Sequence, residues 1–97
     1  MKNCVAVSLQ TSFFERTPYK LRTTAEGLVF TPTRKICSTL SIPAADIVSV
    51  VFYEKRLKLE IEAKGTTEMY FANESDWLNA MKLLKETLGV RIVCEMN

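Results

Sequence analysis

The sequence predicts a mainly β domain (α+β by element count), in which about seven antiparallel strands are followed by one C-terminal helix. Two changes of pattern lead to this fold class. Between Cys4 and Ala72, apolar and polar residues alternate over several short segments, which is the period of a strand with one wet face. Over Asn73–Leu88 the apolar residues recur at helical spacing instead. A length of 97 residues suits a single domain with its own core.

The predicted strands are separated by short turns. Ala25-Glu26-Gly27 and Lys64-Gly65-Thr66 have the composition of tight turns. Pro43 ends one strand because proline cannot donate to a ladder. Thr11–Pro18 is expected to be a loop. In chain order, the predicted strands are Cys4–Gln10, Tyr19–Thr24, Leu28–Thr31, Ser38–Ile42, Ile47–Tyr53, Arg56–Ala63 and a last strand that carries Met69 and Phe71.

Two of these strands are expected to meet the core differently. Arg56–Ala63 alternates strictly, with Leu57 on the inward face and Lys58 on the outward one, so it is predicted to be an antiparallel strand with one wet face. Ile47–Tyr53 is more continuously apolar, as expected of a central strand that is covered on both sides.

Asn73–Leu88 is predicted to be an amphipathic helix with identifiable ends. The side-chain oxygen of Asn73 can cap the first turn, and Asp76 resembles the acidic partner of a capping box. Gly89 follows the last apolar position, where a left-handed terminating residue is favoured. The apolar stripe expected to face the core consists of Trp77, Leu78, Ala80, Met81, Leu84 and Leu88.

The whole chain, residues 1–97, is predicted to be one domain. Residues 90–97 leave alternatives open, because Val90–Cys94 is β-prone and suits an extra edge strand, while a tail or an extension of the helix is equally compatible. No apolar run approaches the roughly 20 residues that span a bilayer. The apolar run after Met1-Lys2 is too short for a signal peptide, so the expected location is cytoplasmic.

The sequence lacks the residues that several common kinds of enzyme catalysis require. The chain contains no histidine, which removes Ser–His and Cys–His nucleophile pairs. Its three glycines fall at turns or at the helix end, so no glycine-rich phosphate loop is present. Glu60, Glu62 and Glu68 are expected to pair across strands with Lys58 and other basic side chains rather than to act as acid and base. We therefore expect a protein that is not an enzyme and that holds no cofactor.

The cysteines and the net charge further limit which metals, disulfides and macromolecular partners are expected. Cys4, Cys37 and Cys94 are odd in number and widely spaced, which argues against a disulfide framework and fits a reducing compartment. They are expected to be small hydrophobic residues rather than metal ligands, with a disulfide between two copies as a minor alternative. A net charge of +2 without a broad basic face gives no reason to expect nucleic acid binding.

Seven antiparallel strands followed by one capping helix resemble the pleckstrin-homology (PH) superfold, and most closely its bacterial PH-like and GRAM-like relatives. Leu40–Val50, with the sequence LSIPAADIVSV, and Phe71–Met81, which is similar to the "F…(S/D)xxWxxAL" helix entry of these domains, carry the resemblance. It covers about Lys20 to Gly89. It implies a curled sheet or partly open barrel, and an interaction module, because this superfold carries lipid, peptide and self-association sites.

The resemblance also implies where an anionic ligand binds. In phosphoinositide-binding PH domains, loops at the open end of the sheet gather basic side chains. Lys20-x-Arg22 is similar to the end of the family's basic motif, K-x(n)-(K/R)-x-R, although the upstream lysine is missing. Phe13 and Phe14 are the candidate membrane contact. The candidate anionic-ligand residues are Arg16, Lys20, Arg22, Arg34, Lys35 and Lys64. An ordinary solvated surface is the alternative for these six.

The leading predicted function is protein–protein association, above all self-association. PH-like domains frequently bind a peptide or a second copy at an open sheet edge by adding a strand. Val90–Val93 suits this role, either by covering an edge in cis or by pairing in trans, because an exposed apolar strand is an aggregation liability. Val90, Ile92 and Val93 are the candidate association residues. A peripheral membrane adaptor that binds anionic lipid is the alternative function.

Overall fold

The structure, a computed structural model, describes residues 4–11, 13, 15–34, 38–88 and 92–95, the last of these as backbone only. Within these ranges it contains eight strands, one α-helix and one short 3-10 helix. In chain order they are β1 (Cys4–Gln10), β2 (Arg16–Thr24), β3 (Gly27–Pro32), β4 (Leu40–Pro43), η1 (Ala44–Asp46), β5 (Ser49–Tyr53), β6 (Lys58–Glu62), β7 (Thr66–Tyr70), α1 (Glu74–Leu88) and β8 (Ile92–Glu95).

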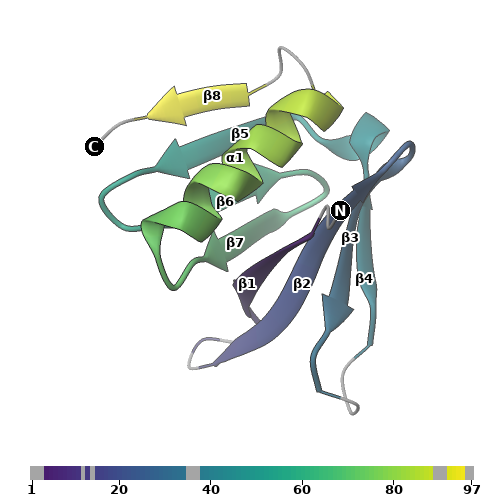
Figure 1. Cartoon of the computed structure of the whole chain (residues 1–97). Helices are drawn as coiled ribbons and strands as arrows, with labels where there is room; N and C mark the ends of the chain where they lie inside the picture. The colour runs from purple at the N-terminus through teal and green to yellow at the C-terminus, as the bar shows by residue number, and fades with distance from the viewer. Residues whose placement is uncertain (1–3, 12, 14, 35–37, 89–91, 96–97) are drawn as a thin grey trace.

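The strands form one sheet in the order β4-β3-β2-β1-β7-β6-β5-β8 (Figure 1). All neighbours from β4 to β5 are antiparallel, and β8 runs parallel to β5. The expected fold class, mainly β with seven antiparallel strands and a C-terminal helix, is confirmed. β8 comes after the helix, in the segment for which the sequence left an edge strand, a tail and a helix extension open.

β1 joins two halves of the sheet. It pairs with β2 along its whole length, from Cys4–Arg22 to Gln10–Arg16, but with β7 only at Ser8 and Leu9. The sheet therefore bends at β1, and β1 to β4 run in a different direction from β5 to β7 (Figure 1). α1 lies across the concave side of the bend, which leaves the convex side of the sheet open to solvent. We call this convex side the outer face.

The core lies between α1 and the concave side of the sheet. Trp77 is its centre: the side chain is fully buried, and its ring meets that of Phe52 edge to face, with centroids 5.8 Å apart. Its indole Nε1 donates a hydrogen bond to the backbone carbonyl of Lys58 at 3.1 Å, so the one polar atom of the side chain is satisfied. The other largest fully buried side chains are Phe30, Phe52, Leu21, Leu28, Leu59, Ile61, Met69, Leu84 and Val50.

The helix starts where the sequence predicts. Asn73 Oδ1 accepts a hydrogen bond from the backbone N–H of Asp76 at 2.8 Å, which satisfies one of the unpaired donors of the first turn. Trp77, Ala80 and Leu84 are buried as expected. Leu78, which we expected to widen the apolar stripe, is 48% exposed, because it lies at the margin of the face that meets the sheet. No helix in the described ranges is long and apolar enough to cross a bilayer.

Several strands differ from their predicted bounds. β3 is one residue longer at each end, β4 runs from Leu40 to Pro43 instead of Ser38 to Ile42, and β5 and β6 each begin two residues later than predicted. The differences at β2 and β6 have an identifiable cause. β2 begins at Arg16, so the expected loop Thr11–Pro18 is wrong at its end: β1 continues to pair as far as Gln10–Arg16, and Pro18 lies inside the strand opposite Ser8. Leu57 belongs to the turn before β6 and has a φ of +48°. Its carbonyl accepts the N–H of Phe71 at 2.9 Å, so the turn is held by the far end of β7.

The expectation that Ile47–Tyr53 is covered on both sides is also wrong. Val50 and Phe52 are fully buried beneath α1, whereas Val51 and Tyr53, on the outer face, are only half-buried. Val48, just before β5, is 70% exposed. The strand is therefore central by position, between β6 and β8, but has one covered face.

Candidate functional site

Lys20 and Arg22 stand next to each other on the outer face of β2. Their exposed side chains alternate with those of Tyr19 and Leu21, which are buried in the core. Alternate residues of a strand stand on the same face about 7 Å apart. Neither side chain forms an ion pair with any residue that the structure describes. We call these two residues the basic pair.

Arg16 stands on the same face of β2 but is held by its neighbours. Its guanidinium carbon lies 3.6 Å from the centre of the Tyr70 ring, and its Nε donates to Gln10 Oε1 at 3.3 Å. The register of β1 brings these groups together, because Gln10 pairs with Arg16 and Ser8 pairs with Tyr70. A cation stacked on an aromatic face is oriented by it, so Arg16 is directed across β1 towards β7.

A second group of charges lies on the outer face of β6 and β7. The Nζ of Lys58 is 2.8 Å from Glu60 and 3.3 Å from Glu68, and it lies 5.6 and 5.5 Å from the ring centres of Tyr53 and Tyr70. We call these five residues the lysine cluster.

The expected cross-strand pairing with Lys58 is confirmed for Glu68, whereas Glu60 reaches Lys58 along the same strand and Glu62 accepts a hydrogen bond from Thr66 Oγ1 instead. The expectation of a wet Lys58 is wrong, because the residue is only 9% exposed.

The ionisation of the lysine cluster follows from its contacts. The hydrogen bond to Glu60, and then that to Glu68, raises the pKa of Lys58 well above its usual value, although burial opposes the shift. The hydroxyl of Tyr70 donates to Glu68 at 2.7 Å, and this bond, followed by the contact with Lys58, lowers the pKa of Glu68. Both shifts favour the charged forms of Lys58 and Glu68.

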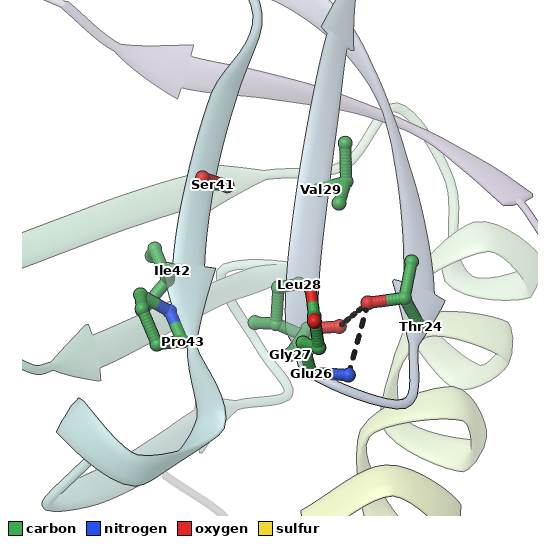
Figure 2. A pocket seen from close by; sticks show the side chains of 8 residues that line it. All are labelled: Thr24, Glu26, Gly27, Leu28, Val29, Ser41, Ile42 and Pro43. Carbon is green, nitrogen blue, oxygen red and sulfur yellow. Dashed lines mark hydrogen bonds between the residues drawn. The ribbon is translucent and has the colours of Figure 1, made fainter.

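A hollow of about 280 Å³ opens on the outer face near the β2–β3 turn (Figure 2). Its lining residues include Thr24 of β2, Glu26 of the β2–β3 turn, Val29 of β3, and Ser41 and Pro43 of β4. Arg22 pairs with Val29 across β2 and β3, and Val29 pairs with Ser41 across β3 and β4. The basic pair therefore begins at the rim of the hollow.

The hollow depends on Gly27, which directly follows the β2–β3 turn. Gly27 has a φ of +153°, and a Cβ at this position would meet the carbonyl of Ile42 and lie 2.9 Å from Pro43 Cα. Thr24 Oγ1 donates to the Gly27 carbonyl at 3.4 Å and accepts from the Glu26 N–H at 3.2 Å (Figure 2). The turn is thus tied from within, and β4 can approach it closely only because residue 27 has no side chain.

The remaining predicted basic residues are divided between the two ends of β4. Arg34 is exposed in the bend after β3, where the N–H of Thr33 donates to the Pro18 carbonyl at 3.3 Å. Lys64 lies in the β6–β7 turn, and its Nζ is 3.8 Å from Asp46 in η1, beyond the other end of β4. The structure does not bring Lys64 and Arg34 together. Lys35 lies outside the described residues.

The candidate membrane contact is described in part. Phe13 lies in the β1–β2 connection and is 87% exposed, and its carbonyl accepts a hydrogen bond from Gln10 Nε2 at 3.4 Å. Phe14 lies outside the described residues. Phe13 is the most exposed of the large apolar side chains that the structure describes.

The candidate association edge is occupied within the chain. Ile92 and Val93 belong to β8, where they pair with Val50 and Val51 of β5. Val90 lies outside the described residues. β8 therefore covers the edge of β5 in cis, and the described sheet ends at β8 on one side and at β4 on the other.

Sequence reasoning missed the aromatic members of the lysine cluster and the hollow. Tyr70 lies two residues after Glu68 and so stands on the same face, which was a usable signal. The hollow left no such signal, because Val29 and Ser41 are neighbours only through the β3–β4 register. Among the described residues, no group of three or more acidic or cysteine side chains is placed to hold a metal ion.

Comparison with known proteins relates the chain to others by fold only. No family model matches it, and no curated protein matches it. The Spt16D–Pob3N heterodimer structure matches 94% of this chain with a TM-score of 0.69 and 17% identity. The N-terminal PH domain of human ARAP2 matches with a TM-score of 0.71 and 13% identity, and the match covers 88% of the present chain and 76% of the ARAP2 chain.

A third match is the inner membrane complex sub-compartment protein 3 of Toxoplasma gondii, with a TM-score of 0.66 and 13% identity over 88% of this chain and 73% of that one. The present chain spans only 51% of the matched chain in the Spt16D–Pob3N structure. The fold is therefore PH-like, and the resemblance found in the sequence is confirmed at that level. The closer likeness to GRAM-like domains stays a prediction.

Proposed function

We propose that this domain is a non-enzymatic interaction module that binds another protein chain by strand addition, and that a second copy of itself is its first partner. The observation that carries the proposal is the free edge of β4. β4 pairs with β3 on one side, and no described strand lies on its other side. An unpaired strand edge offers a row of backbone donors and acceptors to an incoming chain.

The sequence and surroundings of β4 favour such pairing. The strand reads Leu-Ser-Ile-Pro and has no charge that would repel an incoming strand, although Pro43 cannot donate to a ladder and so restricts pairing to Leu40–Ile42. On its free side a depression of about 260 Å³ separates it from the β6–β7 turn, with Ile42 and Thr66 among the lining residues. An added strand projects alternate side chains to each face, and this depression gives room for one of them.

Because β8 pairs with β5 within the same chain, self-association is now expected through β4 rather than through Val90–Val93. A second copy can pair with β5 only if β8 leaves, because Ile92 and Val93 already occupy that edge. β4 has no such competitor among the described strands. Two β4 strands that meet antiparallel about a two-fold axis form a closed dimer, in which each copy uses the same surface.

Static light scattering over a range of concentrations tests the proposal. The intact, reduced chain is expected to be a dimer, and Leu40→Lys is expected to weaken dimerisation by about tenfold or more, because a lysine on an edge strand opposes pairing. Leu78→Lys is the matched control: Leu40 is 42% exposed and Leu78, on the helix, 48%. A monomeric wild-type chain, or equal effects of the two lysines, would contradict self-association through β4.

A peripheral membrane adaptor is the second candidate, and the exposure of Phe13 favours it. An exposed aromatic side chain beside the strand that carries Arg16 suits insertion into an anionic interface. Under this alternative, Phe13→Ser and Arg34→Glu should reduce co-sedimentation with phosphatidylserine vesicles, and salt should release the protein. Lys82→Glu, which changes the same charge on the exposed side of α1, serves as the control. Unchanged sedimentation of the first two variants would dismiss the adaptor.

We also propose a reducing compartment, the cytoplasm, as the site of action. The described thiol, that of Cys4, is free and half-buried, as expected of a cysteine that acts as a small hydrophobic residue.

A further inference from the structure

We propose that the outer face of β2 to β4 is the docking site for an extended acidic segment of a partner protein. In this arrangement Lys20 and Arg22 bind carboxylates of the segment, and the hollow between Thr24 and Ser41 receives one of its side chains. The inference rests on the proposed role as a protein-binding module, and it adds the chemistry of a partner and the surface that it uses.

The charges of the sheet are divided between its two halves. β1 to β4 contain Arg16 and the basic pair, and no aspartate or glutamate. β5 to β7 contain three glutamates and a single cation, Lys58. The acidic residues nearest in sequence to β2 are Glu15 and Glu26, one at each end of the strand. The middle of the first half of the outer face is therefore uniformly positive.

The basic pair differs from Lys58, which is neutralised by two carboxylates, and from Lys64, which faces Asp46, in having no ionic partner among the described residues. It shares this property with several other exposed lysines and arginines. What sets it apart from those is its place in the middle of a strand, where the two side chains stand at a fixed spacing on one face. Their spacing of about 7 Å equals that of alternate side chains in an extended chain. A segment with carboxylates at every second position can therefore satisfy both cations at once.

The hollow continues the line of the basic pair. Thr24 follows Arg22 by two residues on β2 and lines the hollow, so a third alternate side chain of the same segment falls above it. Val29, Ser41 and Pro43 line it as well, and so does Glu26 of the β2–β3 turn, whose carboxylate disfavours a third acidic side chain there. The preferred segment thus reads acidic, any residue, acidic, any residue, and then a small apolar residue.

The composition of this face favours a protein segment over a membrane or a nucleic acid. The neighbours of Lys20 across β1 and β3 are Ala6 and Thr31, which are small and offer neither a wedge for lipid nor a ring for base stacking. None of the exposed large apolar side chains stands on it. Phe13 and Val48 lie in connections, Leu78 lies on α1, and Leu40 pairs with the inward-facing Phe30.

Fluorescence anisotropy with defined peptides tests the inference. The probe is a labelled peptide of alternating glutamate and valine, and its matched probe alternates lysine and valine. The wild-type chain should bind the glutamate probe, more weakly as salt is added, and should not bind the lysine probe. Lys20→Glu with Arg22→Glu should weaken binding by about tenfold or more, because two attractions become repulsions. Ser41→Trp, which fills the hollow, should weaken it as well.

Lys55→Glu with Arg56→Glu is the matched control, because it reverses the same two residue types at exposed positions of the β5–β6 turn. Circular dichroism first establishes that each variant folds and melts at the same temperature as the wild-type chain, and only such variants are compared in the binding experiment. Equal affinity of the two double variants would overturn the site. A wild-type chain that does not bind the glutamate probe would also overturn the site. This holds even if the basic pair binds phosphatidylserine vesicles or single-stranded DNA.

Light scattering on the same samples separates this inference from the proposed function. A dimer that is sensitive to Leu40→Lys but ignores the glutamate probe overturns the acidic partner and leaves the interaction module intact. A chain that binds the probe through Lys20 and Arg22 but stays monomeric supports the acidic partner and overturns self-association.

Discussion

Glu60 and Glu68 lie directly opposite each other on β6 and β7, and the ammonium of Lys58 lies 2.8 Å from the first carboxylate and 3.3 Å from the second. Like charges at directly opposed positions destabilise an antiparallel pair. The ammonium of Lys58 lies close to both carboxylates and offsets their mutual repulsion. The rings of Tyr53 and Tyr70 limit the access of water to this ammonium. One buried cation therefore ties β6 to β7 on the face that α1 does not cover.

Replacing Lys58 by methionine is expected to lower the free energy of unfolding by about 1–3 kcal/mol. The two glutamates would then face each other without a counterion, and the loss stays below that of a fully buried pair because both carboxylates keep some contact with water. Lys55→Met, at an exposed turn position, should change it by no more than about 0.5 kcal/mol. Urea titration followed by circular dichroism measures both, and similar values for the two variants would refute the role of Lys58.

Glu68 is expected to make the free energy of unfolding decrease at acidic pH. The hydrogen bond from Tyr70 lowers the pKa of Glu68 from its usual 4.5. A carboxyl group whose pKa is lower in the folded chain contributes stability that is present above its unfolded pKa and is lost as the pH falls through the folded one. The wild-type chain should therefore lose stability progressively below about pH 4.5, and Glu68→Gln should lose less.

Urea midpoints at about pH 6 and about pH 3 measure this difference. Tyr70→Phe removes the first cause of the shift and should give an intermediate pH dependence. If Glu68→Gln and the wild-type chain lose the same stability between the two pH values, Glu68 is not the group responsible.

Two glycines provide a matched test of the hollow. Gly27→Ala should destabilise the fold by about 3 kcal/mol or more, because the φ of +153° disfavours a side chain and the new Cβ would meet the backbone of β4. Gly65→Ala, in the β6–β7 turn, meets nothing within 4 Å and should lie within about 1 kcal/mol of the wild type. Thermal unfolding of both variants checks this, and an equal shift of the two would mean that β4 does not depend on Gly27.

Trp77 is expected to contribute through its indole nitrogen as well as through its ring. Trp77→Phe keeps an aromatic contact with Phe52 but leaves the carbonyl of Lys58 without the donor that now lies 3.1 Å away. The buried acceptor should cost about 1–3 kcal/mol, to which the lost volume adds. A urea titration that shows a loss below about 0.5 kcal/mol would mean that the carbonyl has found another donor.

The elements that the sequence predicted correctly are those whose signals are local. The helix combines a cap at Asn73 with apolar residues at helical spacing, and both are satisfied within the segment itself. Pro18 misled the prediction of β2, because a proline and polar neighbours are typical of a loop; its place inside the strand depends on pairing with β1. Alternation continues through Leu57 and therefore predicts a strand residue, but the hydrogen bond from Phe71, a residue far along the chain, fixes it in a turn.

The same distinction applies to the candidate site. Lys20 and Arg22 could be found from the sequence, because their alternation with Tyr19 and Leu21 already indicates one face. Their relation to the hollow could not, since it requires the registers of β2 with β3 and of β3 with β4. The burial of Lys58 was equally hidden: the sequence indicates which way it points, whereas its environment is built by tyrosines on two neighbouring strands.

β8 pairs with β5 from Val50–Ile92 to Tyr53–Glu95. A chain shortened to end at Leu88 should expose the backbone edge of β5, whose sequence Ser-Val-Val-Phe-Tyr is uncharged. Such an edge recruits further strands, so the shortened chain should show a larger mass by light scattering than the intact chain at the same concentration. A chain that ends at Glu95 keeps β8 and should match the intact mass. If the chain ending at Leu88 also matches it, β8 does not protect β5, and the free edge of β5 must be covered in another way.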